Sequence, residues 1–324
     1  MDWDFRKRTE KIEERLNALG RDRTPTLFIL SYDLSESYIF PLDRLEEGIR
    51  YHIDGPLRSE RAVSLPYRFE AVPLDRYRRA FDRVMEEIRR GNTYLLNLTF
   101  PSRIEIDADL ETLYERSDAR FKLLFKNRFV CFSPERFVRI DQGHIHTHPM
   151  KGTIDASIPG AEEKILSDAK EMAEHVMVVD LLRNDLSMVA DRVRVERFRY
   201  VEKIRAGERE LLQVSSHITG KLEEGWPDRL GTILTRMLPA GSITGAPKRK
   251  TTEIIQEVEG YDRGFFTGIF GVFDGESLDS AVMIRFIERQ RNGLVFKSGG
   301  GITVDSDPEA EYRELQEKIY VPFL

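Results

Sequence analysis

Apolar residues recur at helical spacing in several parts of this chain. The segment 75–91 begins at Asp75, which we expect to cap a helix, and ends at Gly91, a residue type that stops helices. Its apolar face consists of Tyr77, Phe81, Val84, Met85 and Ile88. The same spacing predicts helices over residues 161–190 (straight or kinked), 228–238 and 249–259, and a C-terminal helix with Asp307 as cap and Pro308 at its first position.

Short apolar runs between turn residues predict strands. They cover residues 24–54 (an opening hairpin or meander), 93–100, 121–140 and 193–220. Asp-Gly and Asn-Gly turns then separate the segments 265–273, 278–289 and 294–299, which predicts two successive antiparallel hairpins. Because strands come as meanders and helices as blocks between them, we predict an α+β fold with large antiparallel or mixed sheets covered by helices. No break in composition divides the chain, so we treat residues 1–324 as one intertwined domain.

Composition narrows the class of protein. The chain has 324 residues, enough to bury a core, and its 50 basic and 56 acidic residues give a net charge of −6, which does not indicate a nucleic-acid binder. A single cysteine excludes an intrachain disulfide framework. The N-terminus lacks the apolar core of a signal peptide, and no apolar stretch of about 18 residues predicts a membrane span. We therefore expect a cytoplasmic protein that binds neither nucleic acid nor membrane.

Two pairs of glutamates indicate a cation site. Glu171 and Glu174 lie three residues apart in one predicted helix, and Glu311 and Glu314 have the same spacing in the C-terminal helix. Such a pair is usually a solvated stripe, but the first pair opens a nearly apolar helix, HVMVVDLL. If the fold brings the pairs together, their oxygens suit Mg²⁺, whereas zinc-like His and Cys spacing is absent.

Two glycine-rich segments and one lysine carry further candidate chemistry. PAGSITGAPKRK and KSGGGITV place backbone N–H groups where an anion could approach, with a tight turn as the alternative; neither is a P-loop. Lys151 stands between Pro149 and Gly152, and the local sequence leaves open whether it is a nucleophile or an exposed turn lysine. Cys131 lies in an apolar strand pattern, so we expect a buried core residue.

Taken together, these segments resemble the chorismate-utilising enzymes, a family that includes component I of anthranilate and aminodeoxychorismate synthases and the isochorismate and salicylate synthases. The matching strings are GNTYLLNLT, FSPERF, PMKGT, KEMAEHVMVVDLLRNDL, PAGSITGAPK, RGFFTG, AVMIRF and SGGGITVDSDPEAEY. The resemblance implies a four-layer α/β/β/α sandwich of two mainly antiparallel sheets. It also implies a catalytic core over about 90–324, after a shortened N-terminal region over about 1–90.

Within the family, the resemblance is closest to aminodeoxychorismate synthase component I. Those enzymes carry Lys where this chain has Lys151, whereas anthranilate synthases carry Ala. The water-activating Lys of isochorismate and salicylate synthases is replaced by Leu95, which cannot act as a base. The chain departs from the family at Gln213, where many members have His, and at Phe266, where they have Tyr. An anthranilate synthase component I and a non-catalytic anion-binding member are the alternatives.

The resemblance implies a reaction and roles for particular residues. Chorismate and ammonia would give 4-amino-4-deoxychorismate, a step towards p-aminobenzoate and folate. Lys151, with a pKa lowered by burial beside a metal, would attack ring C2, and Glu135 would protonate the departing C4 hydroxyl. Mg²⁺ would be held by Glu174 and Glu314, with Glu171 and Glu311 in support. The implied substrate contacts are Arg285, Thr244, Gly241, Gly299, Gly300, Gly301, Gln213 and Lys318. A separate glutamine amidotransferase subunit is the implied partner.

Overall fold

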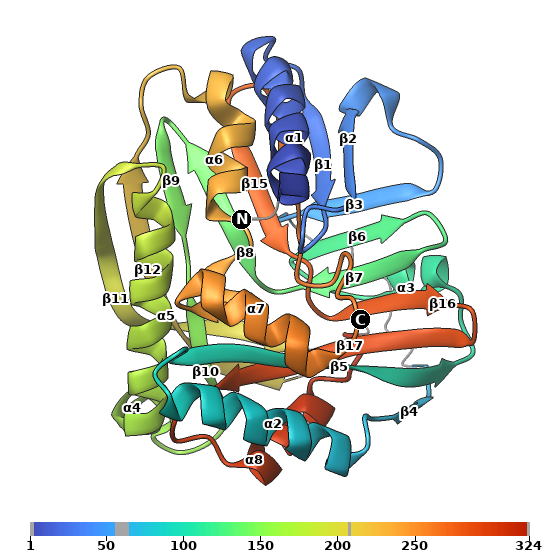
Figure 1. The fold of residues 1–324 in the computed structure, drawn as a ribbon, viewed down its shortest axis with the longest axis vertical. Coiled ribbons are helices and arrows are strands. Elements are labelled where there is room, and N and C mark those ends of the chain that lie inside the picture. The colour runs from blue at the N-terminus through green and yellow to red at the C-terminus, as the bar shows by residue number, and fades with distance from the viewer. Residues whose placement is uncertain (1–2, 56–64, 207–208, 323–324) are drawn as a thin grey trace.

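The computed structural model describes residues 3–55, 65–206 and 209–322, which form two large antiparallel sheets flanked by helices (Figure 1). The first sheet has the strand order β10-β12-β9-β8-β15-β14-β1-β2, with β11 paired to β12. Its strands are β1 (Thr26–Leu30), β2 (Ser37–Pro41), β8 (Arg136–Asp141), β9 (His144–Thr147), β10 (Met150–Asp155), β11 (Asp191–Ala206), β12 (Arg209–Lys221), β14 (Ile269–Phe273) and β15 (Leu278–Val282).

The second sheet has the order β13-β5-β17-β16-β7-β6-β3, with β4 paired to β5. Its strands are β3 (Ile49–Ile53), β4 (Tyr67–Glu70), β5 (Leu95–Ile106), β6 (Phe121–Phe125), β7 (Phe129–Ser133), β13 (Gly245–Ala246), β16 (Phe286–Gln290) and β17 (Gly293–Ile302). The helices are α1 (Trp3–Arg21), α2 (Leu74–Arg89), α3 (Leu110–Arg116), α4 (Ala161–Ser167), α5 (Ala169–Ser187), α6 (Leu230–Met237), α7 (Lys248–Glu259) and α8 (Pro308–Glu317).

Three buried apolar clusters hold four layers together. Helices α1, α5 and α6 cover one face of the first sheet, with side chains such as Leu16 in that core. Helices α2, α7 and α8 cover the second sheet, with side chains such as Phe81. Between the sheets, Phe129 packs in the same cluster as Phe270. This α/β/β/α arrangement confirms the predicted α+β sandwich.

Helix boundaries agree with the sequence in part. Asp307 does cap α8, because its carboxylate accepts the N–H of Ala310 at 2.9 Å. Asp75 does not cap α2: it lies in the first turn, and Pro73 occupies the cap position without a side-chain hydrogen bond. The predicted helix over 161–190 is two helices. Asp168 separates them, ending α4 and capping α5 through the N–H of Glu171 at 2.9 Å.

The predicted strand over 278–289 is wrong, because the chain changes sheet within it. Strand β15 belongs to the first sheet and β16 to the second, and residues 283–285 cross between them. Arg285 has a φ of 51° at this point, which is uncommon outside glycine. Residues 134–135 make the reverse crossing from β7 to β8. The crossings are joined by two hydrogen bonds, from Val282 N to Glu135 O and from Phe132 N to Arg285 O, both of 3.1 Å.

No helix in the described part of the chain is both long and apolar enough to span a membrane.

Candidate active site

A cavity of about 630 Å³ is lined by residues of both sheets, of α5 and of α8. It brings together most residues that the sequence singled out. Those that line it are Glu135, Lys151, Glu171, Glu174, Gln213, Thr244, Arg285, Gly299, Gly300, Gly301, Glu314 and Lys318. These residues lie in eight separate stretches of the chain between Glu135 and Lys318, so the fold alone assembles the site.

Lys151 lies on β10 and reaches the first turns of α5. Its Nζ is 2.6 Å from Oε2 of Glu174. Burial lowers the pKa of Lys151, but Glu174, Glu314 and Glu171 outweigh it, so that the pKa is raised above its ordinary value. The expectation of a pKa lowered by burial beside a metal stays a prediction, because here the glutamates alone surround the amine. Lys151 is a cation held by a carboxylate until something else neutralises Glu174.

The two glutamate pairs face each other from α5 and α8. Lys170, which the sequence did not single out, places its Nζ 3.8 Å from both Glu174 Oε1 and Glu311 Oε1, and so bridges the helices. Burial raises the pKa of Glu171 and also that of Glu311. In Glu314, burial is outweighed by Lys318, whose Nζ lies 2.6 Å away, and the pKa is lowered.

The donor set fits a hard divalent cation. Oε2 of Glu171 is buried and has no hydrogen-bond partner, and the raised pKa values of Glu171 and Glu311 indicate too little positive charge nearby. Carboxylate oxygens are the ligands that Mg²⁺ takes in proteins. Lysines now neutralise part of the cluster, and no group of three or more His, Cys, Asp or Glu in the described ranges is already arranged around a metal position. The Mg²⁺ site stays a prediction.

Glu135 occupies the crossing between β7 and β8. Burial raises the pKa of its carboxyl group, although Ser242, Lys318 and Arg285 act in the opposite direction. Ser242 lies in a short 3₁₀ turn, Gly241–Ile243, and its hydroxyl donates to Glu135 Oε1. A carboxyl group with a raised pKa beside a cavity is suited to donate a proton. Ser242 was missed, because the sequence pointed only to Gly241 and Thr244 as substrate contacts in this segment.

Arg285 sits on the adjoining crossing. Its guanidinium carbon lies 4.7 Å from the ring centroid of Tyr320, and its Nε is buried without a hydrogen-bond partner. The stacked guanidinium therefore retains donors for a carboxylate in the cavity. Tyr320 follows α8 in an irregular segment, and no sequence pattern pointed to it.

The glycines of the predicted anion sites have structural reasons as well. Gly299, Gly300 and Gly301 lie in β17, paired with β5, rather than in the tight turn that was the alternative. A Cβ on Gly299 would stand 2.2 Å from Leu98 O, and one on Gly300 would stand 3.4 Å from carboxylate oxygens of Glu311 and Glu314. A side chain at Gly299 would therefore clash with the backbone of β5, whereas Gly300 places bare backbone next to the carboxylates of α8.

Two of the predicted substrate contacts, Gly241 and Thr244, form hydrogen bonds within the protein instead. Gly241 does not line the cavity: its N–H donates to Asp185 Oδ2 at 3.0 Å, and a Cβ there would stand 2.8 Å from the same oxygen. The hydroxyl of Thr244, which lines the cavity, donates to Ala240 O at 2.8 Å. Asp185 also pairs with Lys248 at 2.7 Å. These contacts fix the segment that carries Ser242.

The chain belongs to the chorismate-binding enzymes: the model of that family matches residues 32–323. An uncharacterized PabA-like protein of Pasteurella multocida is 49% identical, over 95% of this chain and 97% of its own length. Aminodeoxychorismate synthase component 1 of Salmonella typhimurium is 34% identical, over 75% of this chain and 56% of its own. Anthranilate synthase component 1 of Archaeoglobus fulgidus is also 34% identical, over 76% of this chain and 61% of its own length.

Solved structures agree in fold. Anthranilate synthase component I from Streptococcus pneumoniae superposes with a TM-score of 0.66 at 25% identity, over 78% of this chain and 59% of its own. The menaquinone-specific isochorismate synthase of Escherichia coli gives a TM-score of 0.70 at 15% identity, over 95% of this chain and 80% of its own length. At that identity the second likeness concerns the fold alone.

Proposed function

We propose that this protein is an aminodeoxychorismate synthase component I, which converts chorismate and ammonia to 4-amino-4-deoxychorismate and water. The observation that carries the proposal is Lys151, the lysine of PMKGT, which lines the same cavity as a carboxyl group of raised pKa, Glu135. The relative from Salmonella typhimurium supports it. Since an anthranilate synthase is equally identical, overall similarity does not distinguish the two reactions, and the proposal rests on Lys151, where the resemblance has Lys in aminodeoxychorismate synthases and Ala in anthranilate synthases.

The side chains can carry both halves of the reaction. Lys151 loses its proton and its pairing with Glu174, and its Nζ bonds to ring C2 while the ring double bonds shift and the C4–O bond breaks. Glu135 gives its proton to the departing hydroxyl, which leaves as water. The nitrogen of ammonia then bonds to C4, the double bonds shift back, and the electron pair of the C2–N bond returns to Lys151. The proton that Lys151 lost at the start goes to solvent, and the new ammonium group at C4 returns a proton to Glu135, which restores the acid.

Other groups would hold the substrate and balance its charge. Arg285 and Lys318 are cations at the cavity wall and are suited to the two carboxylates of chorismate. Mg²⁺, held by Glu174 and Glu314 with Glu171 and Glu311 in support, would supply Lewis-acid stabilisation of the ring carboxylate. Because Mg²⁺ would share Glu174 with Lys151, its binding would also free the amine.

Two observations weigh against the alternatives. Anthranilate formation ends with loss of pyruvate and of a ring proton, and Gln213, at the position where many family members have His, is a neutral amide that cannot take that proton. A non-catalytic anion-binding member would have no use for Glu135 with a raised pKa. We therefore expect the enolpyruvyl group to stay on the product.

Product identification tests the proposal. The purified chain is incubated with chorismate, MgCl₂ and ammonium chloride, and the products are separated and weighed by mass spectrometry, with and without added aminodeoxychorismate lyase. Aminodeoxychorismate, which the lyase turns into p-aminobenzoate, supports the proposal. Fluorescent anthranilate would establish the first alternative, and unconsumed chorismate the second. Lys250→Ala is the matched control for Lys151→Ala, because Lys250 is an exposed lysine that pairs with Glu253 at 3.1 Å and does not line the cavity.

A further inference from the structure

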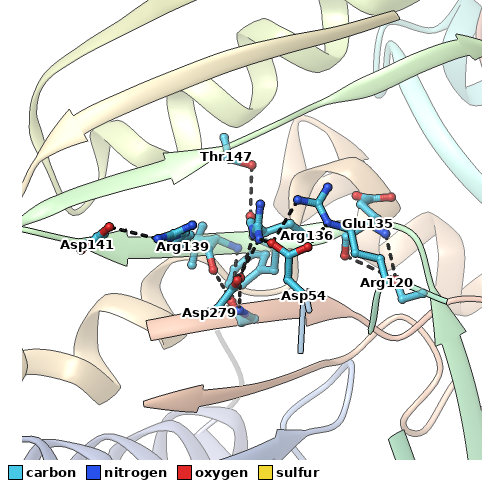
Figure 2. Close-up of polar contacts among 12 residues, drawn as sticks. Asp54, Arg120, Glu135, Arg136, Arg139, Asp141, Thr147 and Asp279 are labelled. Carbon is cyan, nitrogen blue, oxygen red and sulfur yellow. Dashed lines mark hydrogen bonds and ion pairs between the residues drawn. The ribbon is translucent and has the colours of Figure 1, made fainter. Parts of the chain in front are cut away.

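Arg136, the residue after Glu135, is buried and fully engaged. Its side chain is 4% exposed, its Nε donates to Asp279 Oδ1 at 2.7 Å and its Nη2 donates to Asp279 Oδ2 at 2.8 Å. Figure 2 shows this two-pronged contact between β8 and β15. A bidentate pair fixes direction as well as distance, so Arg136 locks the first residue of β8 to its neighbouring strand.

The same guanidinium reaches the second sheet. Its Nη2 also contacts Oδ2 of Asp54, the residue that follows β3. Arg120, which precedes β6, holds Asp54 from the other side through Nε at 2.6 Å and Nη2 at 3.2 Å (Figure 2). Burial of Asp54 is outweighed by Arg120 and Arg136, which lower its pKa to about 2, so it is a carboxylate. The network therefore ties the two sheets together beside the crossing that carries Glu135.

The backbone pairing next to this crossing is irregular. The register between β15 and β8 shifts between Asp279 and Ala281. Within the shift, the hydroxyl of Ser280 accepts the N–H of Val138 at 3.2 Å and donates to its carbonyl oxygen at 2.7 Å. Side chains thus replace part of the regular ladder, and the next backbone bond holds Glu135 itself, from Val282 N to Glu135 O at 3.1 Å.

We propose that Arg136 is a positioning residue: by clamping β8 to Asp279 and Asp54, it fixes the crossing on which Glu135 presents its carboxyl group to the cavity. The inference rests on the proposed function for the acid role of Glu135. Arg136 itself does not line the cavity and acts through its neighbour. A proton donor must stand within hydrogen-bond reach of the leaving oxygen, and a misplacement of about 1 Å costs about a hundredfold in rate.

Steady-state kinetics with ammonia test this role. Arg136→Gln should lower kcat about tenfold to a hundredfold while the KM for chorismate stays within about twofold. Arg139→Gln is the matched control and should behave as the unchanged protein, because Arg139 is an exposed arginine of the same strand that pairs with Asp141 at 3.0 Å (Figure 2). In a Glu135→Gln background, Arg136→Gln should cause no further loss. Equal losses in both backgrounds, or no loss in either, would overturn the inference.

A second readout does not depend on turnover. Hydrogen–deuterium exchange of the peptide containing Val282 should be faster in Arg136→Gln than in Arg139→Gln. Should Arg136→Gln not fold, Arg136→Met combined with Asp279→Leu removes the clamp and leaves no unpaired charge from that pair. Unchanged exchange in a folded Arg136 variant overturns the positioning role whatever the product of the reaction. A chain that yields no aminodeoxychorismate but shows faster exchange instead contradicts the proposed function alone.

Discussion

The Nζ of Lys151 and Oε2 of Glu174 lie 2.6 Å apart, so the candidate nucleophile is paired with a candidate metal ligand. Oε2 cannot pair with the Lys151 amine and bind a metal ion at the same time. A cation bound at Oε2 would displace the amine, and the displaced amine would then be free to lose its proton. Under the proposed function, metal binding at this oxygen would therefore also activate Lys151.

Removal of Lys170 is expected to tighten Mg²⁺ binding. Its Nζ stands 3.8 Å from both Glu174 and Glu311, so Lys170→Ala removes a positive charge that opposes the ion. We expect about twofold to fivefold tighter binding, since an exposed ion pair is worth at most about 1 kcal/mol. Calorimetric titration with MgCl₂ measures it. Glu174→Gln, in contrast, should abolish both the binding heat and turnover, and weaker binding by Lys170→Ala would contradict the assignment.

Ser242 is expected to set the upper pH limit of turnover. Its hydroxyl donates to Glu135 Oε1, which stabilises the carboxylate and so lowers the pKa of Glu135. Ser242→Ala removes that effect, the pKa rises further, and the acid stays protonated to higher pH. The falling limb of the kcat–pH profile should move to higher pH. Ser277→Ala is the control, at a half-buried turn serine whose hydroxyl donates to Asp274 Oδ2 at 2.6 Å. A shift to lower pH would refute the interpretation.

The chain alone is expected to use ammonia but not glutamine. Glutamine hydrolysis needs an activated nucleophile, normally a thiolate with a histidine partner. Cys131 is the only cysteine, it is fully buried, and burial raises the pKa of its thiol. Turnover with ammonium should rise with pH as the free amine accumulates. Glutamine should become a donor only when a purified amidotransferase is added, and glutamine-dependent turnover without one would reveal a glutaminase site outside this account.

Tyr320 is expected to influence substrate binding through Arg285. The guanidinium stacks on its ring at 4.7 Å, and loss of such a contact costs about 0.5–1 kcal/mol. Tyr320→Leu should therefore raise the KM for chorismate about twofold to fivefold with little change in kcat. Tyr320→Phe keeps the ring and should keep the KM. If both variants behave alike, the ring is not what orients Arg285.

Capping and turn residues in the sequence were enough to predict helices and strands whose ends depend on neighbouring residues. The cap at Asp307 and the proline after it specify the start of α8 within a few residues, and the structure places the helix there. The strand break at Arg285 has no such signal. Its positive φ is imposed by contacts with residues far away in sequence, such as the hydrogen bond from Phe132 N to Arg285 O.

The residues of the candidate site could be predicted from the sequence, but the contacts between them could not. Resemblance to a family named Lys151, Glu135 and the four glutamates, and the fold brings them to one cavity or its edge. The pairing of Lys151 with Glu174 was not foreseen, because a charge partner depends on how β10 meets α5. The role proposed for Arg136 likewise needs the structure, since Asp54 and Asp279 lie far from it in sequence.

The central claim is that Lys151 forms a covalent bond to the substrate. The protein is mixed with chorismate and MgCl₂ without ammonia, quenched rapidly in acid, and examined by intact-mass and peptide mass spectrometry. We predict an adduct with the mass of chorismate less one water on the peptide that contains Lys151, absent from Lys151→Ala and lost when ammonium is added before the quench. Unmodified Lys151 in a protein that nevertheless makes aminodeoxychorismate, or full activity of Lys151→Ala with ammonia, would contradict the claim.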